Sequence, residues 1–173
     1  MCMTGRYIGT ENQLLIQILE GETAADFCKW TIETLVDIIA TNANVMLKKG
    51  TLTNDEQIHI AELVVNLFAL IYDDGNYGFY HCRVSKWSIL IAKCHARNQD
   101  VEETLQWLEQ AMTHAAKFDS LNDGEYTSLI VRYNKYHSSQ NDDSQLAIRR
   151  KDLSDSCFEF VRDDDRFKKW LIG

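Results

Sequence analysis

Proline is absent from the 173-residue chain, although average usage of roughly 5% would supply about eight prolines. Long uninterrupted helices tolerate this absence best, because proline removes a backbone donor and breaks a helix interior. The most apolar run, "AELVVNLFALIY", is interrupted by Glu62 and Asn66, and it is too short and too polar to span a membrane. The sequence therefore predicts a helical protein that does not enter a membrane.

Sequence signatures of catalysis and nucleotide binding are also missing. The chain has no P-loop, no GxGxxG, no nucleophile elbow and no cysteine-protease signature, so we expect no cofactor and identify no catalytic residue. The cysteines form an odd, unclustered set without a CxxC spacing: Cys2, Cys28, Cys82, Cys94 and Cys157. Together with the lack of a secretory signal, this set is typical of reduced thiols in a cytoplasmic protein.

Positive charge is scarce. The chain has 18 Lys and Arg against 26 Asp and Glu, which gives a net charge of -8. Such a balance opposes attraction to DNA and to anionic lipid. We therefore expect no direct nucleic-acid binding by this chain and no membrane partner. Its length suits one domain over residues 1–173.

Hydrophobic spacing predicts an all-α fold. After a loose start over residues 1–10, helices are expected over 11–21, 22–49, 53–72, 80–96, 101–118 and 144–159. A last short helix is expected over 164–171. A brief helical pattern also resumes in "YTSLIVRYNKY". Thr53 with Glu56 and Asp100 with Glu103 form capping patterns at two of the predicted helix starts. The middle of 53–72 is apolar almost all round, which predicts burial on more than one side.

Two predicted helices carry apolar stripes that should face the core. In the segment 22–49 the stripe consists of Cys28, Ile32, Leu35, Val36 and Ile39. In the segment 80–96 it consists of Val84, Trp87, Ile91 and Cys94.

The second of these helices has a His-Cys pair near one end and a Cys-His pair at the other. Cys82 and Cys94 are 12 residues apart, which is about 18 Å along a helix, so they cannot share a metal ion or a disulfide. A buried thiol with a half-exposed imidazole is the favoured interpretation, and no metal ligand is assigned. A small cytosolic all-α enzyme or metal-binding protein using Cys and His remains the alternative.

Residues 84–117 resemble the 34-residue helix-turn-helix unit of a tetratricopeptide repeat. Ala92 and Thr104 occupy the small positions of this unit, Leu108 occupies a large apolar position, and Ala111 occupies a later alanine position. The chain departs from the unit at the turn, where Gln99 replaces the usual glycine. The resemblance implies antiparallel helical hairpins stacked as a right-handed superhelix, a short α-solenoid. Residues 118–173 form a less regular C-terminal cap in this interpretation.

The cap resembles the end of a tetratricopeptide-type domain. Such a domain forms the C-terminal part of Firmicutes helix-turn-helix regulators of the phage-repressor (Xre) type. The matching segments are "FDSLNDGEYTSLIV" and "CFEFVRDDDRF", and no part of residues 1–60 looks like the DNA-binding domain of that family. The resemblance implies a non-enzymatic, regulatory module that binds a protein or peptide and forms a homodimer.

The candidate partner contacts are aromatic and basic residues of the two best-matched regions: Trp87, Trp107, Tyr126, Arg132, Arg162 and Arg166. Aromatic side chains at helical spacing more often pack in a core. Arg162 and Arg166, with Asp164, form either a recognition site or an end-capping turn that ties the last helix back onto the repeats. The capping interpretation is favoured, because terminal repeats need a polar outer face.

Overall fold

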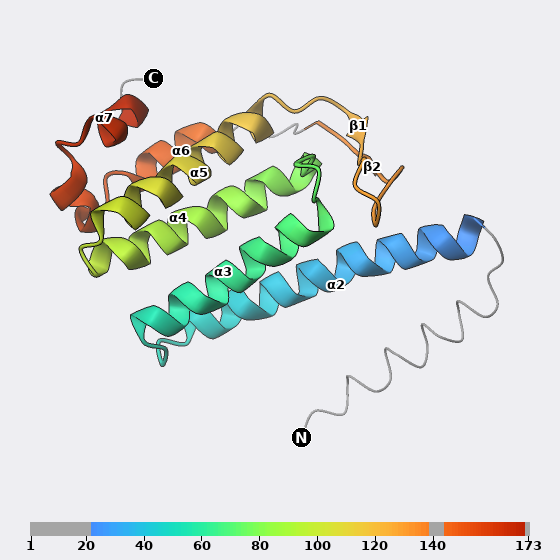
Figure 1. Ribbon diagram of the computed structural model, residues 1–173, viewed down its shortest axis with the longest axis horizontal. Coiled ribbons are helices and arrows are strands. Elements are labelled where there is room, and N and C mark those ends of the chain that lie inside the picture. Colours follow the sequence, from blue (N-terminus) through green and yellow to red (C-terminus); the bar gives the residue numbers. More distant parts are fainter. Residues whose placement is uncertain (1–21, 139–143, 172–173) are drawn as a thin grey trace.

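A computed structural model describes residues 22–138 and 144–171, and most of them are helical, as predicted. The helix predicted over 11–21 lies outside the described residues. Four long helices follow one another: α2 (Glu22–Lys48), α3 (Asn54–Ile71), α4 (His81–Arg97) and α5 (Val101–Asp119). A short 3-10 turn, η1 (Gly78–Tyr80), leads into α4. Figure 1 shows the four helices side by side in chain order.

Both predicted capping patterns form. The Thr53 hydroxyl accepts a hydrogen bond from the Glu56 backbone N–H, and the Glu56 carboxylate accepts one from the Thr53 N–H at 2.7 Å. The Asp100 side chain accepts from the Glu103 N–H at 3.2 Å. These bonds satisfy backbone donors that have no partner in the first turn of a helix, and so they fix where α3 and α5 begin.

Neighbouring helices run antiparallel. The Tyr72 hydroxyl, just after α3, donates to Glu33 near the start of α2 at 3.2 Å. The Asn54 amide at the start of α3 donates to the Cys94 carbonyl near the end of α4 at 2.7 Å. Each contact joins the beginning of one helix to the end of another, so α2 and α3 form one hairpin, and α3 and α4 also run in opposite directions.

Helices α4 and α5 pack closely along small residues. Ala92, Thr104 and Ala111 are each 0% exposed. Small side chains at a helix contact let the two backbones approach. The predicted stripe of α4 is also buried: Val84, Trp87, Ile91 and Cys94 are between 0% and 6% exposed.

The turn between α4 and α5 places Gln99 in the left-handed conformation, with φ of 58°. The Gln99 N–H donates to the Ala96 carbonyl at 3.0 Å, and the Asp100 N–H donates to the His95 carbonyl at 3.2 Å. This is the Schellman pattern, in which glycine is the usual residue at the left-handed position. We expect Gln99→Gly to raise the free energy of unfolding by about 1 kcal/mol, measured by urea denaturation. Gln99→Ala keeps the strained backbone, so a gain of equal size in that variant would contradict the explanation.

The helical pattern predicted in "YTSLIVRYNKY" is wrong. Two short strands, β1 (Gly124–Glu125) and β2 (Lys135–Tyr136), pair antiparallel around this segment. Ser128 donates to the Asp74 carboxylate at 2.6 Å, and Thr127 donates to the same carboxylate. Such side-chain bonds compete with a helix and hold the segment as a turn against the loop after α3.

In the final third, the helix predicted over 144–159 is shorter than expected, whereas the last helix is found where it was predicted. The elements are α6 (Gln145–Asp152), the 3-10 turn η2 (Ser156–Val161) and α7 (Asp165–Leu171). The single helix expected over 144–159 is interrupted, because Asp155 accepts from the Cys157 N–H at 3.1 Å and starts a new turn. Asp119 at the end of α5 accepts from the Gln145 N–H at 2.7 Å and from the Leu146 N–H at 2.9 Å, which anchors α6.

Two hydrophobic clusters hold these elements together. The first joins α2, α3 and α4 to Tyr126 and Val131 of the turn segment. The second joins α4 and α5 to the C-terminal elements through Leu153, Phe158 and Phe167. None of the described helices combines the length and hydropathy that crossing a membrane requires.

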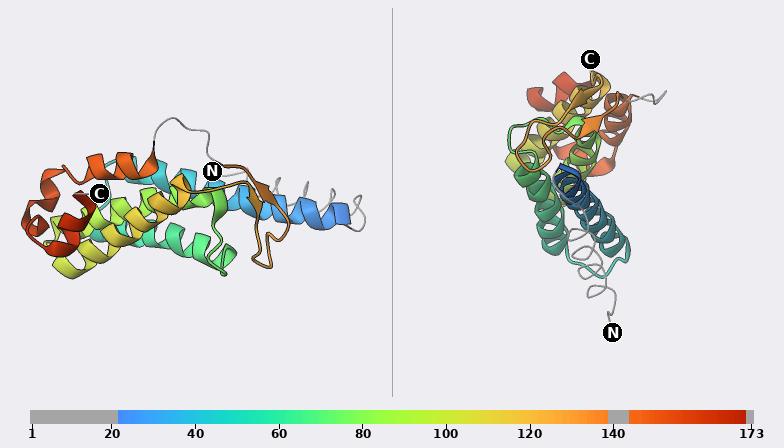
Figure 2. Two further views of the ribbon diagram at one scale, coloured as in Figure 1. Left: turned by 90° about the horizontal axis from the view of Figure 1, so that it is seen from above. Right: turned by 90° about the vertical axis from the view of Figure 1, so that its right-hand side faces the viewer.

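Two predicted core faces are only partly correct. In α2 the fully packed side is Val36, Ala40 and Ala43, whereas Leu35 is 42% and Ile39 is 40% exposed. The outer side of α3 is also open, since Leu63 is 51% and Leu70 is 69% exposed. The physical reason is position. Helix α2 lies at the edge of the stack, whereas α3 lies between α2 and α4 and packs against both, as predicted, with only its outer side open (Figure 1 and Figure 2).

Candidate functional site

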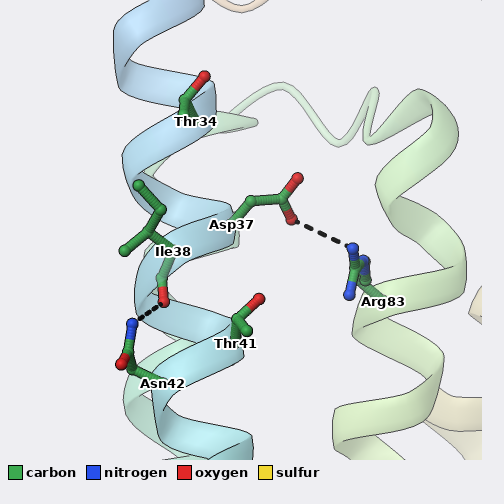
Figure 3. A pocket seen from close by; sticks show the side chains of 6 residues that line it. All are labelled: Thr34, Asp37, Ile38, Thr41, Asn42 and Arg83. Atoms are coloured by element: carbon green, nitrogen blue, oxygen red, sulfur yellow. Dashed lines mark hydrogen bonds and ion pairs between the residues drawn. The ribbon is translucent and has the colours of Figure 1, made fainter.

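A groove opens between α2 and α4, the first helices of the two successive hairpins. Its cavity measures about 310 Å³, and α2 supplies most of the wall at positions one helical turn apart. The lining residues are Thr34, Asp37, Ile38, Thr41, Asn42 and Arg83. Figure 3 shows five of these side chains along α2 and Arg83 reaching toward them from α4.

Opposite charges face each other across the groove. A guanidinium nitrogen of Arg83 lies 3.6 Å from Asp37 Oδ1, and the two side chains are 40% and 38% exposed. Tyr80 donates to Asp37 Oδ2 in a long contact of 3.5 Å. Asp37 Oδ1 is itself buried, yet it accepts no hydrogen bond from the residues that the structure describes. The ion pair is therefore loose, and one carboxylate oxygen of Asp37 keeps unused acceptor capacity beside Arg83.

A buried polar cluster holds α2 in place beside the groove. Glu33 accepts from the Asn134 amide at 2.8 Å and from the Tyr72 hydroxyl at 3.2 Å. Burial raises the pKa of Glu33, which the two hydrogen bonds only partly offset. Burial, reinforced by nearby Tyr80, raises the pKa of Tyr72 as well, so its hydroxyl stays protonated and remains a donor. This cluster connects α2 to the turn segment, one helical turn before Asp37.

The groove offers binding groups of several kinds. Thr34 and Thr41 supply hydroxyl groups, and Asn42 supplies an amide. Asp37 supplies a negative charge and Arg83 a positive charge. Ile38 supplies an apolar contact. Such a mixture can pair with the N–H and C=O groups of an extended peptide and can recognise one charged side chain of it. Convergent polar groups in a concave site are a usual basis for ligand recognition.

The two Cys-His pairs stay at opposite ends of α4. His81 lies beside His114 of α5, with 2.9 Å between the Nδ1 atoms, and Cys94 is buried. Burial, together with His114 and Lys117, lowers the pKa of His81 to about 3, and burial also lowers the pKa of His114 to about 4. Within 22–138 and 144–171, no group of three or more His, Cys, Asp and Glu residues is placed to hold a metal ion.

The residues selected from the sequence as partner contacts lie outside the groove. Trp87 is 6% and Tyr126 is 3% exposed, so both rings belong to the core and have little surface for a partner. Trp107 is half-buried and packs against both hydrophobic clusters, whereas Arg132 is exposed. Arg162 lies 3.0 Å from Glu159, its neighbour in η2.

Arg166 joins the last helix to α5. Its guanidinium donates to both carboxylate oxygens of Glu102 at 2.9 Å and to Asp164 at 3.2 Å. Lys169 of the same helix donates to Glu109 at 2.8 Å. These contacts tie α7 to α5. They leave Arg166 with little free capacity to recognise a ligand.

A polar row on α2 is the sequence signal for the groove. Thr34, Asp37 and Thr41 recur at helical spacing on a side of α2 that is neither core nor apolar stripe. By itself, this polar row looks like an ordinary solvated helix face. It becomes one wall of a groove only because Arg83 of α4 lies opposite, and the packing of α2 and α4 decides that position.

In the comparisons with known proteins, no family model, no curated protein and no solved structure matches the chain.

Proposed function

We propose that the chain is a non-enzymatic module that binds a protein or peptide in the groove between α2 and α4. The observation that carries this proposal is the groove itself. It is open, it is lined by hydrogen-bonding groups at one-turn intervals, and it holds an ion pair at 3.6 Å that a charged ligand group can exchange. A ligand carboxylate would replace Asp37 as the ion-pair partner of Arg83. A ligand cation would instead replace Arg83 as the partner of Asp37.

The arrangement of the hairpins supports the same class of function. We propose that they stack as a tetratricopeptide-like right-handed superhelix, in which the first helices of successive repeats line the concave binding surface. The resemblance to Xre-type regulators adds a regulatory role to the proposed binding function. Ligand binding and self-association of this module would then control a helix-turn-helix DNA-binding domain.

The proposal is tested by photo-crosslinking in cells of the source organism. A photoreactive amino acid is placed at Thr41 in the groove, and in a matched strain at Thr113, an exposed threonine on the outer side of α5. We expect a discrete crosslinked partner at position 41 and none at position 113, because only the first position faces the groove.

Arg83→Ala provides the chemical control. It removes the cation of the groove without disturbing the core, and we expect the yield of the crosslink at position 41 to fall about tenfold or more. A crosslink of equal yield at both positions, or one that Arg83→Ala leaves unchanged, contradicts binding in this groove.

A further inference from the structure

A second cavity lies among the C-terminal elements α6, η2 and α7. It measures about 170 Å³, and its lining residues are Arg150, Leu153, Ser154, Arg162, Phe167 and Leu171. None of them lines the groove between α2 and α4. The cavity is therefore a separate candidate site, and its test is independent of the proposed function.

Much of the lining of this cavity is apolar. Leu153 and Phe167 are each 1% exposed and belong to the second hydrophobic cluster. Leu171, at the end of α7, is 50% exposed. Because buried and exposed residues both line it, the cavity reaches from the surface to the core. Its inner part suits an apolar group better than it suits water.

The charge on the lining is positive. Arg150 and Arg162 supply two guanidinium groups, and no carboxylate is among the described residues that line the cavity. Acidic residues outnumber basic ones in the whole chain, which has a net charge of -8. A cavity with two arginines and no acid differs from this average and attracts an anion.

Arg150 has unused capacity to donate hydrogen bonds. Its Nε atom is buried, yet it donates to no acceptor among the described residues. The neighbouring Arg149 pairs with Asp152 at 3.0 Å, whereas no ion pair within 22–138 and 144–171 includes Arg150. A buried donor without an acceptor is unfavourable, so an acceptor on a ligand would restore a hydrogen bond that Arg150 lacks in the folded chain.

Arg162 can contribute further donors, whereas the Ser154 hydroxyl cannot. Arg162 lies 3.0 Å from Glu159, but a guanidinium carries five N–H donors, and this contact leaves others free for a ligand. The Ser154 hydroxyl already donates to the Lys151 carbonyl at 2.7 Å. The two arginines are therefore the recognising groups. Guanidinium groups suit a planar carboxylate, which accepts two parallel N–H bonds.

We propose that this cavity binds a small carboxylate attached to an apolar group. The carboxylate accepts hydrogen bonds from Arg150 and Arg162, and the apolar group packs against Leu153 and Phe167.

The volume of the cavity limits the size of this ligand. At about 30 Å³ for each water-sized group, the 170 Å³ of the cavity holds about six such groups. This is below the roughly 300–1,000 Å³ of sites for drug-sized ligands. A branched short-chain acid such as 3-methylbutanoate has about the right size.

NMR titration of the full chain tests the chemistry of the ligand. Four probes are compared: 3-methylbutanoate, its neutral amide, acetate and inorganic phosphate. We expect 3-methylbutanoate to shift the methyl resonances of Leu153 and Leu171 and to bind at least about tenfold more tightly than the other three, because it alone combines a carboxylate with an apolar group. The methyl resonances of Leu129, which is 74% exposed in the turn segment, should not move.

Each of the other outcomes of the titration overturns the proposal. Equal binding of the amide would show that the arginines do not recognise the charge. Equal binding of acetate or phosphate would show that the apolar lining takes no part. The absence of shifts at Leu153 and Leu171 with 3-methylbutanoate would show that the cavity is not the site.

Arg150→Gln tests the role of the buried guanidinium. We expect the affinity for 3-methylbutanoate to fall at least about tenfold. Lys151→Gln is the matched control, because it removes the same charge from the next residue of α6, which is exposed and lies outside the lining of the cavity. This control should bind as the wild type does, and equal losses in the two variants would overturn the proposal.

Arg162→Gln is the second variant and decides the matter if Arg150→Gln does not fold. We expect it to weaken binding by a smaller factor than Arg150→Gln, because Glu159 already engages this guanidinium. An affinity for 3-methylbutanoate that Arg162→Gln leaves unchanged contradicts recognition of the carboxylate by the two arginines.

Discussion

We expect Phe158→Ala to lower the free energy of unfolding by about 3–5 kcal/mol, the largest effect of any substitution considered. Phe158 is 0% exposed, and its ring centroid lies 6.1 Å from that of Phe167. Removing the ring leaves a cavity where η2, α7 and the α4–α5 hairpin meet. Urea denaturation followed by circular dichroism measures the loss.

Phe160→Ala is the matched control for this prediction. Phe160 lies two residues further along η2 and is 38% exposed, so its removal should cost less than about 1 kcal/mol. Equal effects of the two substitutions would show that the C-terminal elements do not pack on the hairpin as the structure has them.

The second large effect is acid destabilisation through the His81–His114 pair. The Nδ1 atoms are 2.9 Å apart, so one imidazole donates to the other and the pair has no place for two added protons. The pKa values of about 3 and about 4 in the folded protein lie below the ordinary value of 6.5, chiefly because of burial. Below pH 6.5 the unfolded chain therefore binds protons that the folded chain does not, and stability falls as the pH falls.

The loss is measured as the free energy of unfolding between pH 7 and pH 5, above the range in which most carboxylates titrate. We expect a decrease of about 2 kcal/mol, allowing for the partial exposure of His114. His81→Asn should reduce the pH dependence by about half, since one of the two buried imidazoles is gone. His59→Gln, on an exposed side chain of α3, should leave the pH dependence unchanged. A pH dependence equal in all three proteins would contradict the assignment to this pair.

Sequence patterns correctly predicted the features that neighbouring residues determine, namely helix capping and a single apolar helix face. Thr53 with Glu56 and Asp100 with Glu103 located two helix starts, because capping involves only residues three positions apart. The buried stripe of α4, including Trp87, was also predictable, since this helix lies inside the stack and shows one dominant apolar face. The α4–α5 turn followed from the short spacing between the two helices.

The errors arose where a long-range contact decides the outcome. Helix α2 has two apolar sides, and only its position at the edge of the stack shows that Val36 faces the core while Leu35 faces outward. The bonds from Thr127 and Ser128 to Asp74, more than 50 residues away in sequence, turn a helix-like segment into a turn. The groove likewise required Asp37 and Arg83 to meet across two helices.

Amide hydrogen exchange on the complex formed in cells tests the central claim most directly. The chain is isolated with its bound partner through an affinity tag, and its exchange is compared with that of the purified chain alone. We predict slower exchange in residues 33–43 of α2 and around Arg83 of α4, with no change in α5. Protection centred on α5, or the recovery of the chain without any partner, would contradict the account of this protein as a binding module that uses the groove between α2 and α4.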